Sequence, residues 1–207
     1  MKKLIVFIIL IAIVFTSFIL INITEKSEAA KAAETNHAAT DKLESEVTAV
    51  RKLLKGNSKY NSEIGFFIDM GIASGKNRFF IYDFNTEKVI DKGLVAHGSG
   101  SETGIEGKLQ FSNINNSRST SLGKYSIGNS YYGKFGKAYK LYGLDKTNSN
   151  AFERYIVLHK YFDVPYEEQP GSICNSLGCP MVNEKFYSRI EKIIDGSEKS
   201  IILNIYY

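Results

Sequence analysis

The chain has 207 residues, with 26 Lys and Arg against 22 Asp and Glu, a formal net charge of +4 and 43% hydrophobic residues. Because the positive charges are spread along the chain rather than clustered, the sequence argues against a protein that binds nucleic acid. The two cysteines lack the two-pair spacing of a structural zinc site.

The amino-terminal segment predicts export. Lys2 and Lys3 precede Leu4–Ile23, twenty residues of which only three are polar. As a helix this run would span ~30 Å, the thickness of a bilayer core, and the lysines favour an amino end in the cytoplasm. A cleaved signal peptide is the alternative, with a small-residue site near residues 30–32. Both interpretations place the rest of the chain outside the cytoplasm, in the cell envelope, and we favour a retained anchor over residues 1–23.

The next part of the chain predicts a tether. Residues 24–58 are rich in Ala, Glu, Lys and Thr, and their only apolar helical pattern includes Val47 and Val50 and stops at Gly56. We interpret them as a flexible or loosely helical tether followed by a short helix. Residues 59–207 are then one domain, which is long enough to bury a core.

That domain is predicted to be mostly β, with few helices. One helix is expected over Asn183–Gly196, with Asn183 as N-cap and Gly196 as C-cap, and a hairpin turn is expected at Asn85–Lys88. The strand candidates are rich in β-branched and aromatic residues. They read GFFIDM, RFFIYDF, KVIDKGLVAH, GKYSIG, AYKLYGL, RYIVLHKYF and SIILNIYY.

The best candidate for chemistry is Cys179, in NSLGCPMV. A cysteine attacks as thiolate and needs a base or a cation beside it, and His159 ends the apolar strand YIVLH twenty residues earlier. Gly178 permits a tight turn, so that its N–H and that of Cys179 could face a developing oxyanion. Ser176 adds a hydroxyl that could hold the loop or a substrate amide. The alternative is a small buried cysteine beside a structural histidine.

Two further residues are less clear from the sequence. His97 ends the strand GLVAH and opens a Gly-Ser loop, where it could line a substrate groove or make a structural hydrogen bond. Cys174 lies five residues before Cys179, and a reversible disulfide between them would silence the site.

Several motifs together resemble a known family. YIVLH followed by Ser176-Leu177-Gly178-Cys179 resembles the histidine plus Ser-x-Gly-Cys signature of the YkuD-like L,D-transpeptidase catalytic family. TSLGKYSIG is similar to that family's Thr-Pro-x-Gly-x-Tyr/Phe strand. The ordered set VAHGSG, FSN, SLGKY, YYGKFG, LYGLD and NAFERYIVLH resembles a murein L,D-transpeptidase subfamily, over about residues 65–207.

The resemblance implies a β-sandwich or barrel with Cys179 as nucleophile, His159 as base, Gly178 and Cys179 N–H groups as oxyanion hole, and Ser176 near the substrate. It implies a peptidoglycan tetrapeptide stem as donor, cleaved before its terminal D-Ala, and the side-chain amine of a neighbouring stem as acceptor, giving a 3→3 crosslink. Water as acceptor would give carboxypeptidase activity. No metal or organic cofactor is implied.

The resemblance includes VAHG, which suggests that His97 lines the donor groove. Tyr132 could stack on sugar or peptide, with packing on the sheet as the alternative, and Gly123 is a further candidate for substrate binding. From the amino-terminal segment, the expected location is the periplasm or the outer face of the inner membrane, with membrane attachment through the amino-terminal helix.

The chain departs from the wider family at Leu177, where His is common, and at Lys160, where Gly is usual. A backbone carbonyl at Lys160 could still orient the histidine. The alternatives are a sortase-like transpeptidase, disfavoured because the only later arginine, Arg189, lies on the predicted helix, and a non-catalytic wall-binding module.

Overall fold

The computed structural model describes residues 40–105 and 107–207. The predicted membrane or signal segment, residues 1–23, lies outside the described residues, as does most of the predicted tether. Within the described part, no helix is both long and apolar enough to cross a bilayer. Contacts divide the chain after Ser45, and the strands and the helix α2 belong to the second unit, Glu46–Tyr207.

A helix covers residues 40–54 and ends before Gly56, where the apolar pattern predicted a stop. Val47 and Val50 are buried on one face of this helix, in agreement with their helical spacing. Seven residues that the sequence placed in the tether, 40–46, are therefore helical.

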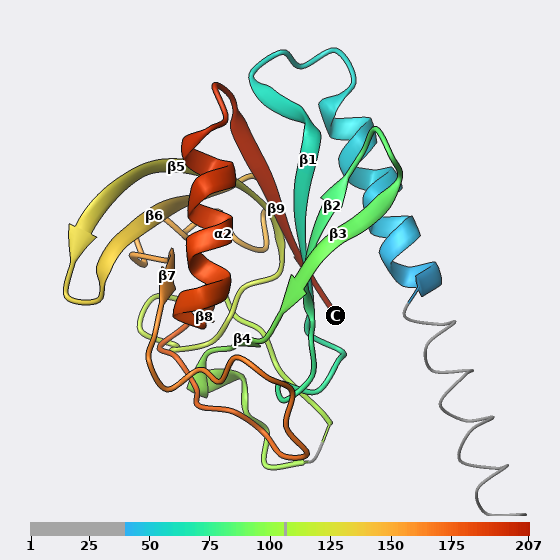
Figure 1. Cartoon of the computed structure of the whole chain (residues 1–207). Helices are drawn as coiled ribbons and strands as arrows, with labels where there is room; N and C mark the ends of the chain where they lie inside the picture. Colours follow the sequence, from blue (N-terminus) through green and yellow to red (C-terminus); the bar gives the residue numbers. More distant parts are fainter. Residues whose placement is uncertain (1–39, 106) are drawn as a thin grey trace, which may run out of the picture. The chain divides into compact units, whose positions relative to one another are not determined.

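The described residues form one nine-stranded sheet, which confirms the mostly-β prediction (Figure 1). Pairing is antiparallel except between β1 and β9 and between β7 and β8. The bounds of the strands, and of one short 3-10 helix, are β1 Tyr60–Asp69, β2 Phe79–Asp83, β3 Lys88–Gly93, β4 Val95–Ala96, η1 Ser99–Ser101, β5 Gly123–Gly133, β6 Gly136–Gly143, β7 Val157–Lys160, β8 Met181–Val182 and β9 Ser200–Tyr206.

The strand order brings the two edges of the sheet together. The order is β3-β2-β1-β9-β5-β6-β7-β8-β4, so β3 and β4 lie at opposite ends. Leu94 alone separates these two strands in the sequence. The sheet must therefore curl until its edges meet, which gives the barrel-like form predicted from the family resemblance.

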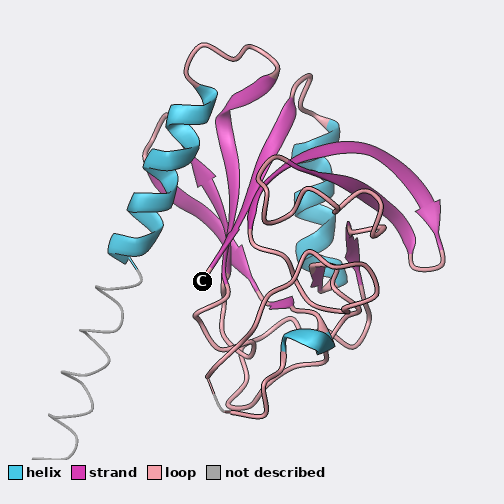
Figure 2. Cartoon of the chain, turned by 180° about the vertical axis from the view of Figure 1, so that it is seen from behind, coloured by secondary structure: helices cyan, strands magenta, loops and turns pink. Residues whose placement is uncertain are grey.

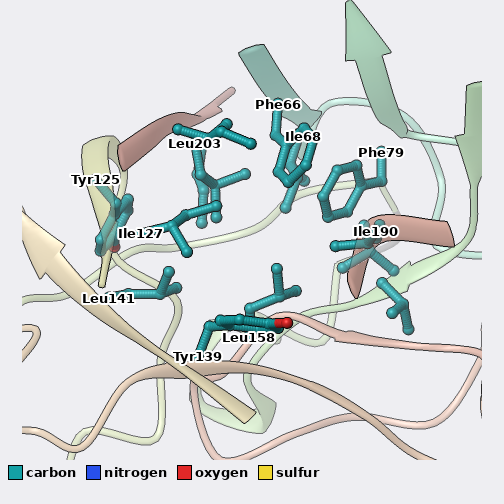
Figure 3. Packing of buried hydrophobic residues seen from close by; sticks show 14 of the residues in the cluster. Phe66, Ile68, Phe79, Tyr125, Ile127, Tyr139, Leu141, Leu158, Ile190 and Leu203 are labelled. Atoms are coloured by element: carbon teal, nitrogen blue, oxygen red, sulfur yellow. The ribbon is translucent and has the colours of Figure 1, made fainter. Parts of the chain in front are cut away.

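One core fills the inside of this curled sheet. Figure 3 shows Phe66 and Phe79 from β1 and β2 opposite Leu141 and Leu158 from β6 and β7. All four side chains are fully buried. The strands that carry the site are thus fixed by packing on both halves of the sheet.

The predicted helix is present as α2, Glu184–Asp195. The Asn183 side chain accepts a hydrogen bond from the Lys185 N–H, as an N-cap does. Phe186 packs edge-on against Phe79 of β2, and the Tyr187 hydroxyl donates to the Lys137 carbonyl of β6. The helix therefore links the two halves of the sheet, directly after the cysteine loop. Seen from behind, the long connections gather at one end of the sheet, beside η1 (Figure 2).

Candidate active site

The pairing of β7 with β8 brings the predicted histidine to the predicted cysteine. These strands run parallel, with His159 opposite Met181, and the His159 N–H donates to the Pro180 carbonyl at 3.4 Å. Cys179 directly precedes Pro180. His159 and Cys179, which are twenty positions apart in the sequence, are thus brought together by a short parallel strand pair.

The His159 imidazole is held in one tautomer. Its Nδ1 lies 3.0 Å from the Lys160 carbonyl oxygen, which can only accept, so the proton of the neutral ring is on Nδ1. Nε2 is then the basic atom. The ring is 5% exposed and stacks on Phe135 with centroids 5.1 Å apart. Burial lowers the pKa of His159, and the Lys160 carbonyl opposes this only in part.

Lys160 explains how the chain tolerates a lysine where the resembled family usually has glycine. Its carbonyl orients His159, as proposed from the sequence, while its ammonium pairs with Glu184 at the start of α2. Its charge is therefore neutralised by a partner on the helix.

The Cys179 thiol is half-buried and neutral at rest. Burial raises its pKa, while the Val157 N–H and the positive charge of Arg154 lower it less. The Val157 N–H donates to Sγ at 3.4 Å, and Sγ lies 3.7 Å from the Tyr155 carbonyl oxygen. Since the pKa of Cys179 is raised and that of His159 is lowered, both groups are uncharged near pH 7. For its sulfur to act as a nucleophile, the thiol would have to lose its proton to a base, and Nε2 of His159 is a candidate for that base.

The cysteine loop is shaped by Ser176 and Gly178. Gly178 has φ +119°, and a Cβ there would lie 3.0 Å from the Ser119 carbonyl oxygen. The Gly178 N–H donates to Ser176 Oγ at 3.0 Å, and Ser176 is buried. The Cys179 N–H, in contrast, has no hydrogen-bond partner among the described residues. Of the two expected oxyanion donors, that of Gly178 is engaged inside the loop and that of Cys179 is available.

A pocket of about 530 Å³ opens beside these groups. It will be called the cysteine pocket. Among the predicted site residues, Cys179, His159 and Ser176 line it, together with Arg154 and Tyr155 from the turn before β7. Its volume is in the range of small-molecule and peptide sites.

Arg154 is a site residue that the sequence analysis missed. Its guanidinium donates to the carbonyl oxygens of Ser112 and Ser119 and to the hydroxyls of Ser117 and Ser121. It lines the cysteine pocket, and its charge lowers the pKa of Cys179. The one signal in the sequence is an arginine just before the strand YIVLH. Its partners lie about 35 residues away, so no local spacing indicates them.

His97 lies on the other side of the cysteine loop. Its carbonyl accepts from the Ser176 N–H at 2.8 Å, but its side chain lines a different pocket. Nδ1 accepts from Arg78 at 2.8 Å, so Nε2 carries the proton and donates to Glu102 at 2.7 Å. Burial, and then the Arg78 charge, lower the pKa of His97.

The structure places the two other predicted substrate-binding residues outside the cysteine pocket. Tyr132 is 83% exposed, and its neighbour Tyr131 lines the pocket instead. Gly123 begins β5 with φ +121°, where a Cβ would come within 2.9 Å of Asp145 and Asn148 side-chain atoms. Their substrate roles stay predictions.

The second cysteine, Cys174, lies outside the cysteine pocket. Cys174 and Cys179 are both free thiols, and Cys174 does not line the cysteine pocket. Among the described residues, no cluster of three or more His, Cys, Asp or Glu side chains could hold a metal ion.

A thiol, an oriented imidazole and an available backbone N–H beside one pocket are the parts that a cysteine-dependent acyl-transfer enzyme requires. The sequence profile described as L,D-transpeptidase catalytic domain matches residues 34–205, well over half of the chain. The chain therefore belongs to the L,D-transpeptidase catalytic domain family, which confirms the resemblance found in its motifs. A search of curated proteins finds no match.

Solved structures with some likeness include the L,D-transpeptidase from Xylanimonas cellulosilytica DSM 15894, with 13% identity and a TM-score of 0.37, covering 70% of this chain and 61% of that one. The helical cell shape determining protein Pgp2 from Campylobacter jejuni has 12% identity and a TM-score of 0.43, covering 69% and 46%. Bd1075 from Bdellovibrio bacteriovorus has 15% identity and a TM-score of 0.42, covering 70% and 48%. The chain thus spans about half to three fifths of the length of these structures.

Proposed function

We propose that this chain is an exported cysteine L,D-transpeptidase that acts on peptidoglycan stem peptides through an acyl-enzyme at Cys179. The observation that carries the proposal is the shared pocket of Cys179 and His159, in which the Lys160 carbonyl leaves His159 Nε2 as the basic atom. Family membership supplies the reaction class, and the amino-terminal hydrophobic segment supplies the case for export.

In the first half-reaction, Nε2 of His159 takes the Sγ proton of Cys179 as sulfur attacks the carbonyl before the terminal D-Ala. The Cys179 N–H donates to the oxyanion that forms. Collapse breaks the C–N bond, and the imidazolium gives its proton to the departing amine of D-Ala. The products are a thioester on Cys179 and free D-Ala.

In the second half-reaction, the side-chain amine of a neighbouring stem attacks the thioester. His159 accepts a proton from that amine and returns it to the departing sulfur, so the site ends in its starting state. The product is a 3→3 crosslink, and water in place of the amine gives a trimmed tripeptide. The cysteine pocket must then admit donor and acceptor in turn.

Incubation of the full-length protein with a disaccharide tetrapeptide, followed by mass spectrometry of the products, tests this function. We expect loss of terminal D-Ala together with a new dimer, and neither product with Cys179→Ala. Loss of D-Ala without dimer would restrict the function to the carboxypeptidase reaction. No product from the unaltered protein would contradict the proposal and favour a non-catalytic wall-binding module.

A further inference from the structure

A second pocket, of about 500 Å³, adjoins the cysteine pocket and is cationic. It will be called the arginine pocket. It shares Arg154, Tyr155 and Leu177 with the cysteine pocket. Among the described residues, its lining contains two arginines and no carboxylate; the lining residues are Asn115, Asn116, Arg118, Arg154, Tyr155 and Leu177. The pocket therefore suits an anion close to the reacting sulfur.

The two arginines differ in what their guanidinium groups do. Arg154 is occupied, because its N–H groups donate to oxygens of the segment 112–121. Arg118 is exposed, and its guanidinium has no hydrogen-bond or ion-pair partner among residues 40–105 and 107–207. Arg154 thus supports the wall of the pocket, whereas Arg118 has its whole planar set of donors free for a ligand.

The backbone of Arg118 is fixed beside the cysteine loop. Its carbonyl accepts from the Gly100 N–H at 3.0 Å. A Cβ on Gly98 would lie 2.2 Å from the Arg118 carbonyl oxygen and 2.9 Å from Gly178 Cα, so these three backbone segments are in contact. The backbone that carries the Arg118 side chain is therefore held next to the cysteine loop.

Two lining residues hold strained backbone conformations. Arg118 and Tyr155 have φ of +55° and +57°, in the left-handed region that residues other than Gly and Asn rarely adopt. Such strain concentrates at ligand sites. Tyr155 also accepts from the Cys179 thiol, so the strained turn joins the arginine pocket to the nucleophile.

We propose that Arg118 binds the free C-terminal carboxylate of the residue that leaves when Cys179 is acylated. This inference rests on the proposed function, in which the leaving residue is a terminal D-Ala. That carboxylate lies one residue beyond the attacked carbonyl. The arginine pocket adjoins the cysteine pocket, because the two share Arg154, Tyr155 and Leu177 as lining residues. A guanidinium pairs with a carboxylate through two parallel N–H···O bonds, and an amide cannot replace that partner. The enzyme would thereby select stems that end at the residue it removes.

The test compares a tetrapeptide donor with the same donor amidated at its terminal carboxyl. The rate constant kcat/KM for release of D-Ala or D-alaninamide is measured for the full-length protein and for Arg118→Asn, in which asparagine keeps the tolerance for positive φ. We expect the unaltered protein to favour the acid by about 10- to 100-fold, and Arg118→Asn to reduce that ratio to near one by losing rate on the acid alone. Arg118→Lys, which keeps the charge without the fork, should give an intermediate ratio.

Lys199→Ala is the matched control, because it removes one exposed positive charge on the turn between α2 and β9, away from both pockets. It should keep the full preference for the acid. An equal rate on acid and amide in the unaltered protein, or an unchanged ratio in Arg118→Asn and Arg118→Lys, would overturn the inference while leaving the transpeptidase function standing. If kcat/KM instead depends on whether the carboxylate of the acceptor is amidated, the inference would also be overturned. No turnover of either donor would overturn the proposed function itself.

Discussion

The cysteine loop lies between two buried histidines that differ in what surrounds their ring nitrogens. His159 is the penultimate residue of β7, and His97 directly follows β4. They are 5% and 3% exposed, and burial lowers the pKa of each. The Lys160 carbonyl takes one nitrogen of His159 and leaves Nε2, whereas Arg78 and Glu102 take both nitrogens of His97. The hydrogen-bond partners of the ring, and not its position near a strand end, therefore distinguish a histidine that can act as a base from one with a structural role.

Replacing His159 should produce the largest change among the variants on this comparison. We expect His159→Gln to lower kcat/KM by about 10²- to 10⁴-fold, because the described residues that line the cysteine pocket include no other histidine and no carboxylate to accept the thiol proton. The free energy of unfolding should fall by less than about 1.5 kcal/mol, since the ring stacks on Phe135 but makes one side-chain hydrogen bond. Assays of D-Ala release from the tetrapeptide donor give kcat/KM, and urea unfolding gives the free energy of unfolding. An active His159→Gln variant would remove the histidine from the mechanism.

Gly178→Ala should cause the next largest loss of activity. The substitution meets both a φ of +119° and the Ser119 carbonyl oxygen at 3.0 Å, so the loop must move. We expect about a 10²-fold loss of activity, as a shift of about 1 Å at a reacting group can cause, and about 1–3 kcal/mol of stability. Leu177→Ala, at an exposed neighbouring position, is the control for stability. Equal activity in Gly178→Ala and the unaltered protein would show that the loop geometry is not needed.

His97 should give the opposite pattern to His159. His97→Gln disturbs a buried contact of the Arg78 guanidinium, so we expect about 2 kcal/mol lower stability. Activity of the folded protein should fall less than about 10-fold, because the ring does not line the cysteine pocket. A large loss of activity at unchanged stability would instead support the role in substrate binding that the sequence suggested for His97.

These contrasts also show what the sequence could reveal. The strands and α2 were predictable, because runs of β-branched and aromatic residues and capping residues are local patterns. A local motif likewise indicated His159 and Cys179 as the candidate pair. The partners that separate His159 from His97 were not, because Arg78 reaches His97 only through the tertiary structure. Arg154 was not predicted as a site residue for the same reason, since it contacts a segment about 35 residues away. The oxyanion donors were predicted as a pair, but the Gly178 N–H is used by Ser176, a contact that spacing alone does not show.

Arg154 offers a smaller test on the cysteine side of the loop. Its positive charge lowers the pKa of Cys179, against the larger opposing effect of burial. In Arg154→Met the thiol pKa should therefore rise, which would be seen as a shift of the iodoacetamide reaction profile to higher pH. Arg118→Asn is the control, because it also removes an arginine near the cysteine loop, but not the one whose charge lowers the pKa of Cys179. An unchanged profile in Arg154→Met would show that the charge does not act on the thiol.

The two buried histidines should also make the stability depend on pH. Both histidines have folded-state pKa values below the ordinary 6.5, so below that pH the unfolded chain binds protons more readily than the folded one. Their contribution to stability is present above pH 6.5 and is lost as the pH falls through the lowered values. We expect the free energy of unfolding to decrease between pH 7 and pH 5, by up to about 1.4 kcal/mol for each pH unit and histidine. His97→Gln and His159→Gln should each remove part of that slope, and an unchanged slope in both would contradict the account.

The role of Cys179 as nucleophile is tested by the mass of the intact protein after brief incubation with the disaccharide tetrapeptide. We expect a mass increase equal to the donor less D-Ala, located on the peptide that contains Cys179. The adduct should be absent in Cys179→Ala and should form slowly in His159→Gln. Release of D-Ala by the Cys179→Ala variant, or an adduct located on another residue, would contradict the claim that Cys179 is the nucleophile.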